Sequence, residues 1–191
     1  MNDSRMNINT LLTSSIDNFH PGMKGVSLCN YTELLSLSKN EQGKITGATI
    51  RDSLSGKEIK VKSKVVVNCT GIHADTVRQM DDESKEARIL GARGTHLIFK
   101  KGVVPDNHGI IVPKTKDGRL IFIINYLGHP MVGTTDVECP VTHHCQPDQD
   151  EIDFICDALK PYFGEDYDYK GNLLSAWAGI RPLCKEGDNG P

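Results

Sequence analysis

A histidine beside small residues is the first position in this sequence that is suited to chemistry. His96 stands in Gly94–Phe99 (GTHLIF), at the start of an expected strand. The ordinary pKa of histidine is about 6.5, so its imidazole accepts a proton near neutral pH. His96 is therefore a candidate general base, and the alternative is a histidine that is hydrogen-bonded at the edge of a sheet.

An arginine close to a strand end is the second such position. Arg181 follows Trp177–Ile180 (WAGI) and precedes Pro182. A guanidinium group keeps its proton and cannot act as a base, but it binds a phosphate or a carboxylate through two hydrogen bonds. Arg181 is a candidate for anion binding, and the alternative is an ion pair within the fold.

Two turns of small and polar residues follow apolar runs. Thr70 and Gly71 come after Val65–Val67 and before the helix-like segment Ala74–Met80. Ligands of doubly wound sheets bind where strands end and helices begin, so this turn is a candidate for contact with a nucleotide. The second turn, Gly133–Asp136 (GTTD), has a composition common at strand ends and indicates little alone.

Neither a metal site nor a complete nucleotide fingerprint is expected. Thr142–Cys145 (THHC) holds adjacent potential ligands, which point to opposite faces of an extended chain. Gly91–Gly94 (GARG) lacks the G-x-G-x-x-G spacing of a dinucleotide-binding turn.

Composition excludes several classes of protein. The net charge of −3 provides no basic field for nucleic acid, and the six cysteines form no C-x-x-C pair, which favours a reduced compartment. No apolar run approaches the roughly 20 residues of a membrane span, and the polar start shows no targeting segment. Any contact with a membrane is expected to be peripheral.

The elements of the first half predict a meander that leads into a buried strand. A short helix is expected over Ile8–Phe19, and extended segments over Val26–Leu37 and Lys44–Asp52. The extended segment Glu58–Asn68 includes three consecutive valines, which predict a fully buried strand, and a helix is expected over Ala74–Met80.

The second half predicts an antiparallel sheet with one covering helix. Asp148 and Glu151 have the spacing of a capping box, before an apolar stripe that ends at Pro161. The fold class is therefore α+β. The expected strands are Thr95–Phe99, Gly109–Val112, Arg119–Asn125, Met131–Thr135 and Asn172–Ile180.

Five segments in order resemble the FAD-dependent glycerol-3-phosphate dehydrogenases, most closely the mitochondrial form. They are VVVNCTGIHADTVRQMDD, GTHLIF, DGRLIFIINY, VGTTDVECPVTHH and SAWAGIRPLC. The wider group includes D-amino-acid oxidase. The resemblance implies part of an FAD-binding domain over residues 1–80, joined to an antiparallel-sheet substrate domain over 81–185 that returns toward the FAD domain. Residues 186–191 are expected to be a truncated tail.

The resemblance also assigns roles to the candidate residues. Thr70 and Gly71 match the family's alanine-threonine-glycine turn against FAD, with Cys69 in place of the alanine. His96 matches a histidine beside the flavin, and Arg181 matches the arginine of the glycine-x-arginine-proline motif in the substrate pocket. The remaining match, to the family's glycine-threonine-threonine-aspartate segment, adds substrate-pocket candidates, namely Thr134, Thr135 and Asp136.

The activity implied is oxidation of sn-glycerol 3-phosphate to dihydroxyacetone phosphate. In the family the C2 hydride passes to the flavin, a base takes the hydroxyl proton, and the electrons continue to a quinone. The resemblance further implies peripheral association with the mitochondrial inner membrane.

The family's N-terminal glycine-rich fingerprint and its later glycine-glycine-lysine segment are missing from these residues. The sequence is therefore expected to be a fragment that alone neither holds FAD tightly nor turns over. Two alternatives stay open: a related FAD-dependent oxidase of amines or amino acids, and a non-catalytic truncated paralogue.

Overall fold

The computed structural model describes residues 3–17, 19–105 and 108–185, and its contacts divide the chain into two units. The first unit is Met1–Val67 and the second is Asn68–Pro191. Helix α2 (Ala74–Asp81) therefore packs with the second unit, although the boundary expected from the sequence follows residue 80. The expected tail, 186–191, lies outside the described residues.

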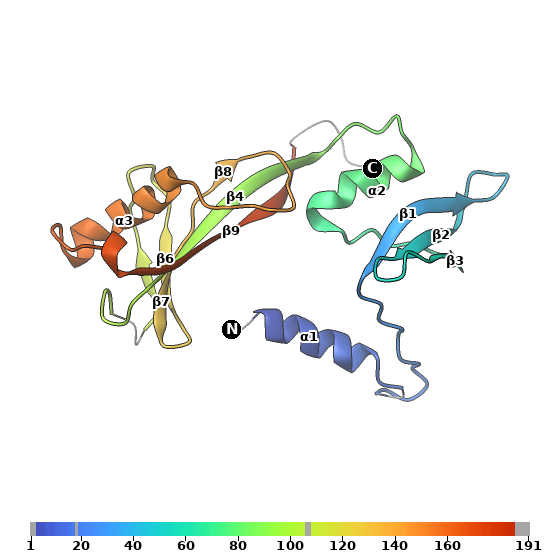
Figure 1. The fold of residues 1–191 in the computed structure, drawn as a ribbon, viewed down its shortest axis with the longest axis horizontal. Coiled ribbons are helices and arrows are strands. Elements are labelled where there is room, and N and C mark those ends of the chain that lie inside the picture. Colours follow the sequence, from blue (N-terminus) through green and yellow to red (C-terminus); the bar gives the residue numbers. More distant parts are fainter. Residues whose placement is uncertain (1–2, 18, 106–107, 186–191) are drawn as a thin grey trace. The chain divides into compact units, whose positions relative to one another are not determined.

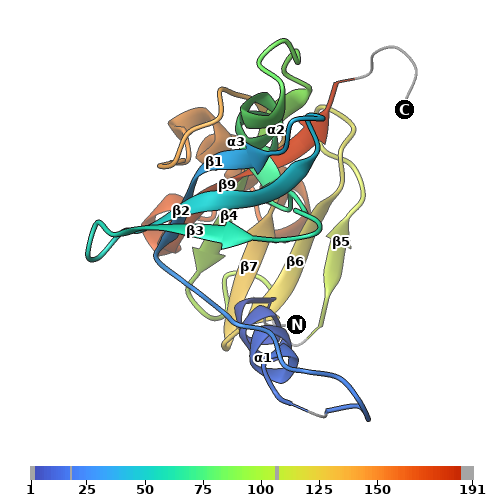
Figure 2. The same ribbon diagram turned by 90° about the vertical axis from the view of Figure 1, so that its right-hand side faces the viewer.

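The first unit contains the expected antiparallel meander. Strands β1 (Thr32–Lys39), β2 (Ile45–Asp52) and β3 (Glu58–Lys62) lie side by side in that order (Figure 2). Gly43 has a φ of +77° in the β1–β2 turn, a conformation that glycine adopts without steric cost.

The strand expected across the three valines is not present. β3 ends at Lys62, and the backbone of Val65–Val67 is irregular. The side chains of Val65 and Val67 are 72% and 75% exposed. A strand of this kind is buried by neighbours on both faces. Among the described residues, no strand pairs with this segment.

The first helix is also displaced from its expected position. α1 covers Asp3–Ser14 and none of its described residues is buried. Two hydroxyls donate to carbonyls of its last turn, Ser14 to Leu11 and Ser15 to Leu12. Such bonds compete with continuation of a helix, so α1 ends before Phe19.

The second unit is built on the expected antiparallel sheet, which has six strands within the described ranges. β4 and β9 are longer than the sequence pattern indicates. β9 pairs with β4 along its whole length, so β7 and β8 share the opposite edge of β4. The strands are β4 (Ile89–Phe99), β5 (Ile110–Val112), β6 (Ile121–Tyr126), β7 (His129–Gly133), β8 (Val137–Glu138) and β9 (Leu173–Cys184).

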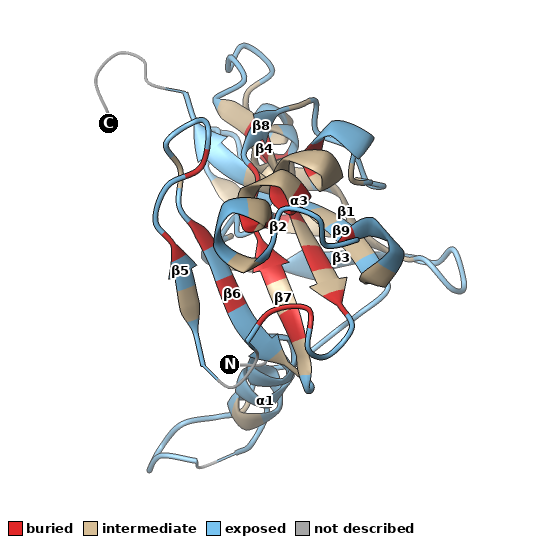
Figure 3. Ribbon diagram, turned by 90° about the vertical axis from the view of Figure 1, so that its left-hand side faces the viewer, coloured by how far each residue is buried: buried red, intermediate tan, exposed pale blue. Residues whose placement is uncertain are grey.

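One face of this sheet is the core, and helix α3 (Gln149–Phe163) covers it (Figures 1 and 3). Leu97 and Phe99 of β4 are fully buried there against Ile155 and Leu159 of α3. The capping box that begins α3 is present as predicted. The remaining elements are two short 3-10 turns, Gly71–His73 and Lys170–Asn172.

Candidate active site

The face of the sheet opposite α3 carries both candidate catalytic residues. Side chains alternate along a strand, so the burial of Leu97 toward α3 directs His96 to the other face. In the register of β4 with its neighbours, His96 is opposite Trp177 of β9 and Gly133 of β7. Arg181 lies four pairs beyond Trp177 along β9, an even number, and is therefore on the same face.

His96 is confined between these two neighbours. Its imidazole stacks on Trp177 with ring centroids 4.4 Å apart and planes at 12°. On the other side, a Cβ added at Gly133 would lie only 2.5 Å from Cδ2 of the imidazole. The ring therefore occupies space that exists because residue 133 has no side chain.

The environment of His96 favours its neutral form. Burial is the main cause that lowers the pKa of this histidine below its usual 6.5, and the positive charge of Arg181 adds to the effect. Its Nδ1 is buried and has no hydrogen-bond partner among the described residues. A neutral imidazole at physiological pH is able to accept a proton.

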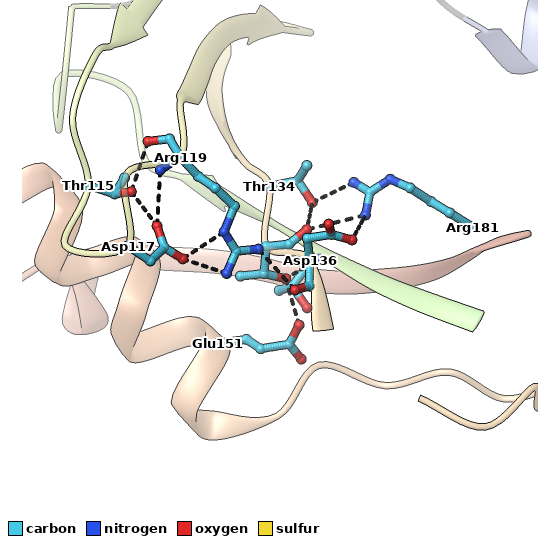
Figure 4. Close-up of polar contacts among 9 residues, drawn as sticks. Thr115, Asp117, Arg119, Thr134, Asp136, Glu151 and Arg181 are labelled. Carbon is cyan, nitrogen blue, oxygen red and sulfur yellow. Dashed lines mark hydrogen bonds and ion pairs between the residues drawn. The ribbon is translucent and has the colours of Figure 1, made fainter. Parts of the chain in front are cut away.

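Arg181 rests on the segment that connects β7 to β8 (Figure 4). One guanidinium nitrogen donates to the backbone oxygen of Thr135 at 3.2 Å and lies 3.4 Å from a carboxylate oxygen of Asp136. The other donates to the hydroxyl of Thr134 at 3.2 Å. A Cβ at Gly94 would lie 2.5 Å from this second nitrogen, so the absence of a side chain at Gly94 leaves room for the Arg181 guanidinium.

The segment Thr134–Asp136 fills the break between β7 and β8 along β4. The backbone N–H of Thr95 donates to the hydroxyl of Thr135 at 2.8 Å, inside the core. On the far side of the segment, Arg119 donates to the backbone oxygen of Asp136 at 3.0 Å. The segment thus has one side toward α3 and one side toward Arg181.

The Thr70–Gly71 turn has the small, open character expected of it. Gly71 has a φ of +56°, and a Cβ there would meet no atom of the described residues within 4 Å. Asn68 shapes the turn by accepting from the Thr70 hydroxyl at 2.7 Å and donating to Ala74 at 2.9 Å. The 3-10 turn that begins at Gly71 contacts β9, the strand of Arg181.

The structure brings together most of the candidate residues. His96, Arg181 and the segment Thr134–Asp136 form one cluster, while within the described ranges the Thr70–Gly71 turn makes no hydrogen bond or ion pair with them. Sequence reasoning missed the contributions of Gly94, Gly133 and Trp177. Only the strand register reveals them, because each acts by its position opposite a residue of another strand.

Comparisons with known proteins agree with the resemblance seen in the sequence. A protein of Dictyostelium discoideum named probable mitochondrial glycerol-3-phosphate dehydrogenase is 37% identical over 98% of this chain and 30% of its own length. The mitochondrial glycerol-3-phosphate dehydrogenase of Arabidopsis thaliana is 38% identical over 97% of this chain and 28% of its own length.

A solved structure matches at the level of the fold and the sequence. The Bacillus halodurans glycerol-3-phosphate dehydrogenase complexed with FAD has a TM-score of 0.75 and 29% identity, covering 83% of this chain and 32% of that one. The chain thus spans less than a third of each of these three proteins.

The family assignment rests on a match over most of the chain. A family model described as FAD dependent oxidoreductase matches residues 23–191. The predicted recognition and the mixed helix and antiparallel-sheet fold are confirmed. The chain belongs to the family of FAD-dependent oxidoreductases.

Proposed function

We propose that this chain is the part of an FAD-dependent glycerol-3-phosphate dehydrogenase that carries its base and its anion-binding arginine. The observation that carries the proposal is the placement of His96 and Arg181 on one sheet face, each beside a glycine that makes room for it. The names of the relatives supply the substrate, glycerol 3-phosphate. Two-electron oxidation of the C2 hydroxyl of sn-glycerol 3-phosphate gives dihydroxyacetone phosphate as the product.

The residues present fit a flavin nucleotide. Thr70 and Gly71 form an exposed turn whose backbone has open space beside it, as close approach of a nucleotide requires. Nδ1 of His96 is a buried polar atom that still needs a partner. FAD, when bound, supplies the acceptor for the hydride of the substrate.

His96 acts as the general base in this proposal. It takes the proton of the C2 hydroxyl as the carbon is oxidised, which requires the neutral imidazole. Burial and the nearby Arg181 charge both lower the pKa of His96, so the neutral form dominates at pH 7. The stack with Trp177 fixes the plane of the ring.

Arg181 supplies positive charge on the same face. Its guanidinium stabilises negative charge that develops on the C2 oxygen, or it holds the phosphate of the substrate. Both roles need a fixed guanidinium, and its contacts to Thr134, Thr135 and Asp136 fix it. These three residues are pocket residues in this proposal because they set the position of Arg181.

The electron acceptor and the location are proposals that rest on the resemblance to the mitochondrial enzymes. We propose a quinone as the acceptor and peripheral association with the mitochondrial inner membrane, in line with relatives named as mitochondrial. No helix within the described ranges is long and apolar enough to cross a membrane.

Substrate turnover tests the proposal. Because this chain alone is expected neither to hold FAD tightly nor to turn over, the flavin-loaded protein in every assay is the full-length protein that contains it. That protein is assayed with glycerol 3-phosphate and, in parallel, with glycine, proline and simple amines, using a soluble quinone analogue as acceptor. Of these compounds, only glycerol 3-phosphate is expected to be oxidised. Preference for an amine or amino acid would replace this function by that of a related oxidase, and a flavin-loaded protein inactive on all of them would indicate a non-catalytic paralogue.

A further inference from the structure

Glu151 is a buried acid in the first turn of α3, and both of its carboxylate oxygens have partners. The residue is 4% exposed. Oε1 accepts a hydrogen bond from the hydroxyl of Thr135 at 2.6 Å. Oε2 lies 2.7 Å from Nε of Arg93 and accepts from the backbone N–H of Asp148 at 3.1 Å. These partners fix the orientation of the carboxylate within the core face.

Thr135 connects this carboxylate to the sheet. The residue is 2% exposed, and its hydroxyl accepts from the backbone of Thr95 while it donates to Glu151. Loss of one partner would leave a buried polar group unsatisfied, which destabilises this arrangement. The position of the Thr134–Asp136 segment therefore depends on the Glu151 carboxylate.

The same segment supports Arg181 on the opposite face. The backbone oxygen of Thr135 and the hydroxyl of Thr134 each accept from the guanidinium at 3.2 Å. Figure 4 shows Glu151 and Arg181 on different sides of this segment. One residue, Thr135, thus bonds to the buried acid through its side chain and to the arginine through its backbone.

We propose that Glu151 is a positioning residue for Arg181, acting through Thr135 to hold the guanidinium in place on the catalytic face. The inference rests on the proposed function in that it takes Arg181 to contact the substrate. The role of Glu151 in the capping box of α3 does not require Thr135, because the cap uses Oε2 of Glu151 and the bond to Thr135 uses Oε1.

Two substitutions separate the positioning role from the helix cap. Thr135→Val keeps the shape of the side chain but removes the hydroxyl, and Thr135→Ser restores the hydroxyl. Neither change touches the capping box. Glu151→Gln tests the carboxylate itself. Asp153→Asn on the same helix is the matched control, since Asp153 forms an ion pair with Lys170 at the surface.

The assay is a double-mutant cycle in the flavin-loaded protein, with kcat/KM for glycerol 3-phosphate measured in the parent and in an Arg181→Ala background. In the parent, Thr135→Val and Glu151→Gln are expected to lower kcat/KM by about 10- to 100-fold, as expected for a displacement of up to about 1 Å. Thr135→Ser is expected to recover part of the kcat/KM that Thr135→Val loses, and Asp153→Asn is expected to stay within about threefold of the parent. In the Arg181→Ala background, Thr135→Val and Glu151→Gln are expected to have no further effect.

A second readout follows from the charge on Arg181. Displacement of the guanidinium weakens its effect on His96, so the acid limb of the pH profile of kcat/KM is expected to move to higher pH in Thr135→Val. If Thr135→Val lowers activity only by destabilising the fold, the acid limb of the pH profile stays at the same pH as in the parent.

The outcomes separate this inference from the proposed function. Equal losses in both backgrounds, or no loss from Thr135→Val in the parent, would overturn the positioning role alone. An Arg181→Ala protein with unchanged kcat/KM would overturn the role of Arg181 and the positioning role with it. Flavin content and thermal unfolding are measured for every variant. Thr135→Val also removes the acceptor of the Thr95 N–H, so Glu151→Asp, which keeps the charge but shortens the reach to Thr135, replaces Glu151→Gln if that variant does not fold.

Discussion

Replacing Gly133 by alanine tests whether the imidazole of His96 must lie where it does. The new Cβ would be placed 2.5 Å from Cδ2, 3.0 Å from Cγ and 3.1 Å from Nε2 of His96. Gly133 does not have a positive φ, so its backbone accommodates alanine. The three closest contacts of the new Cβ are therefore all with the imidazole ring.

The expected loss follows from these distances. Carbon atoms pack at about 3.5–4.0 Å, so the ring must move by roughly 1 Å. It moves toward Trp177, which already stacks on it at 4.4 Å. Misplacement of a catalytic group by about 1 Å lowers the rate by roughly 10²-fold. Crowding is also expected to destabilise the fold by about 1–3 kcal/mol.

The assay compares Gly133→Ala with Gly109→Ala in the flavin-loaded protein. Gly109 precedes β5 and has no positive φ, and an added Cβ would have no atom within 4 Å in the part of the chain that the structure describes, so its substitution is expected to leave kcat/KM unchanged. kcat/KM for glycerol 3-phosphate is measured for both variants, with thermal unfolding as the check of folding. A folded Gly133→Ala protein within threefold of the parent would refute the reasoning.

Three further predictions follow from the same structure. Arg181→Gln removes a charge that lowers the pKa of His96, so the acid limb of the pH profile of kcat/KM is expected to shift to higher pH. Gly94→Ala crowds the Arg181 guanidinium and is expected to lower kcat/KM with glycerol 3-phosphate while flavin content stays unchanged. Leu159→Ala, at a fully buried position of α3, is expected to lower the free energy of unfolding by about 2–5 kcal/mol in urea titrations.

Local patterns predicted the elements that depend on local chemistry. The capping box of Asp148 and Glu151 starts α3 as expected, because its bonds join residues three positions apart. The helix expected over Ala74–Met80 is present as Ala74–Asp81. Gly91–Gly94, which lacks the spacing of a nucleotide fingerprint, lies within β4 and pairs with β9.

Features that depend on distant partners were not predictable in the same way. The valines at Val65–Val67 have the composition of a buried strand, yet burial requires neighbours that the described residues do not provide. Glu151 was recognisable as a cap, but its bond to Thr135 spans 16 positions and depends on how α3 packs on the sheet. The roles of Gly94 and Gly133 likewise depend on register, which composition does not encode.

The reductive half-reaction of His96→Ala tests the central claim most directly. Flavin bleaching by glycerol 3-phosphate is followed under anaerobic conditions in a stopped-flow instrument, with His129→Ala as the control. His129 lies in β7 and, like His96, has a buried Nδ1 that lacks a hydrogen-bond partner in the part of the chain that the structure describes. If His96 is the base, His96→Ala slows bleaching by about 10²-fold or more and His129→Ala leaves it unchanged. Bleaching by His96→Ala within a few-fold of the parent would contradict the account.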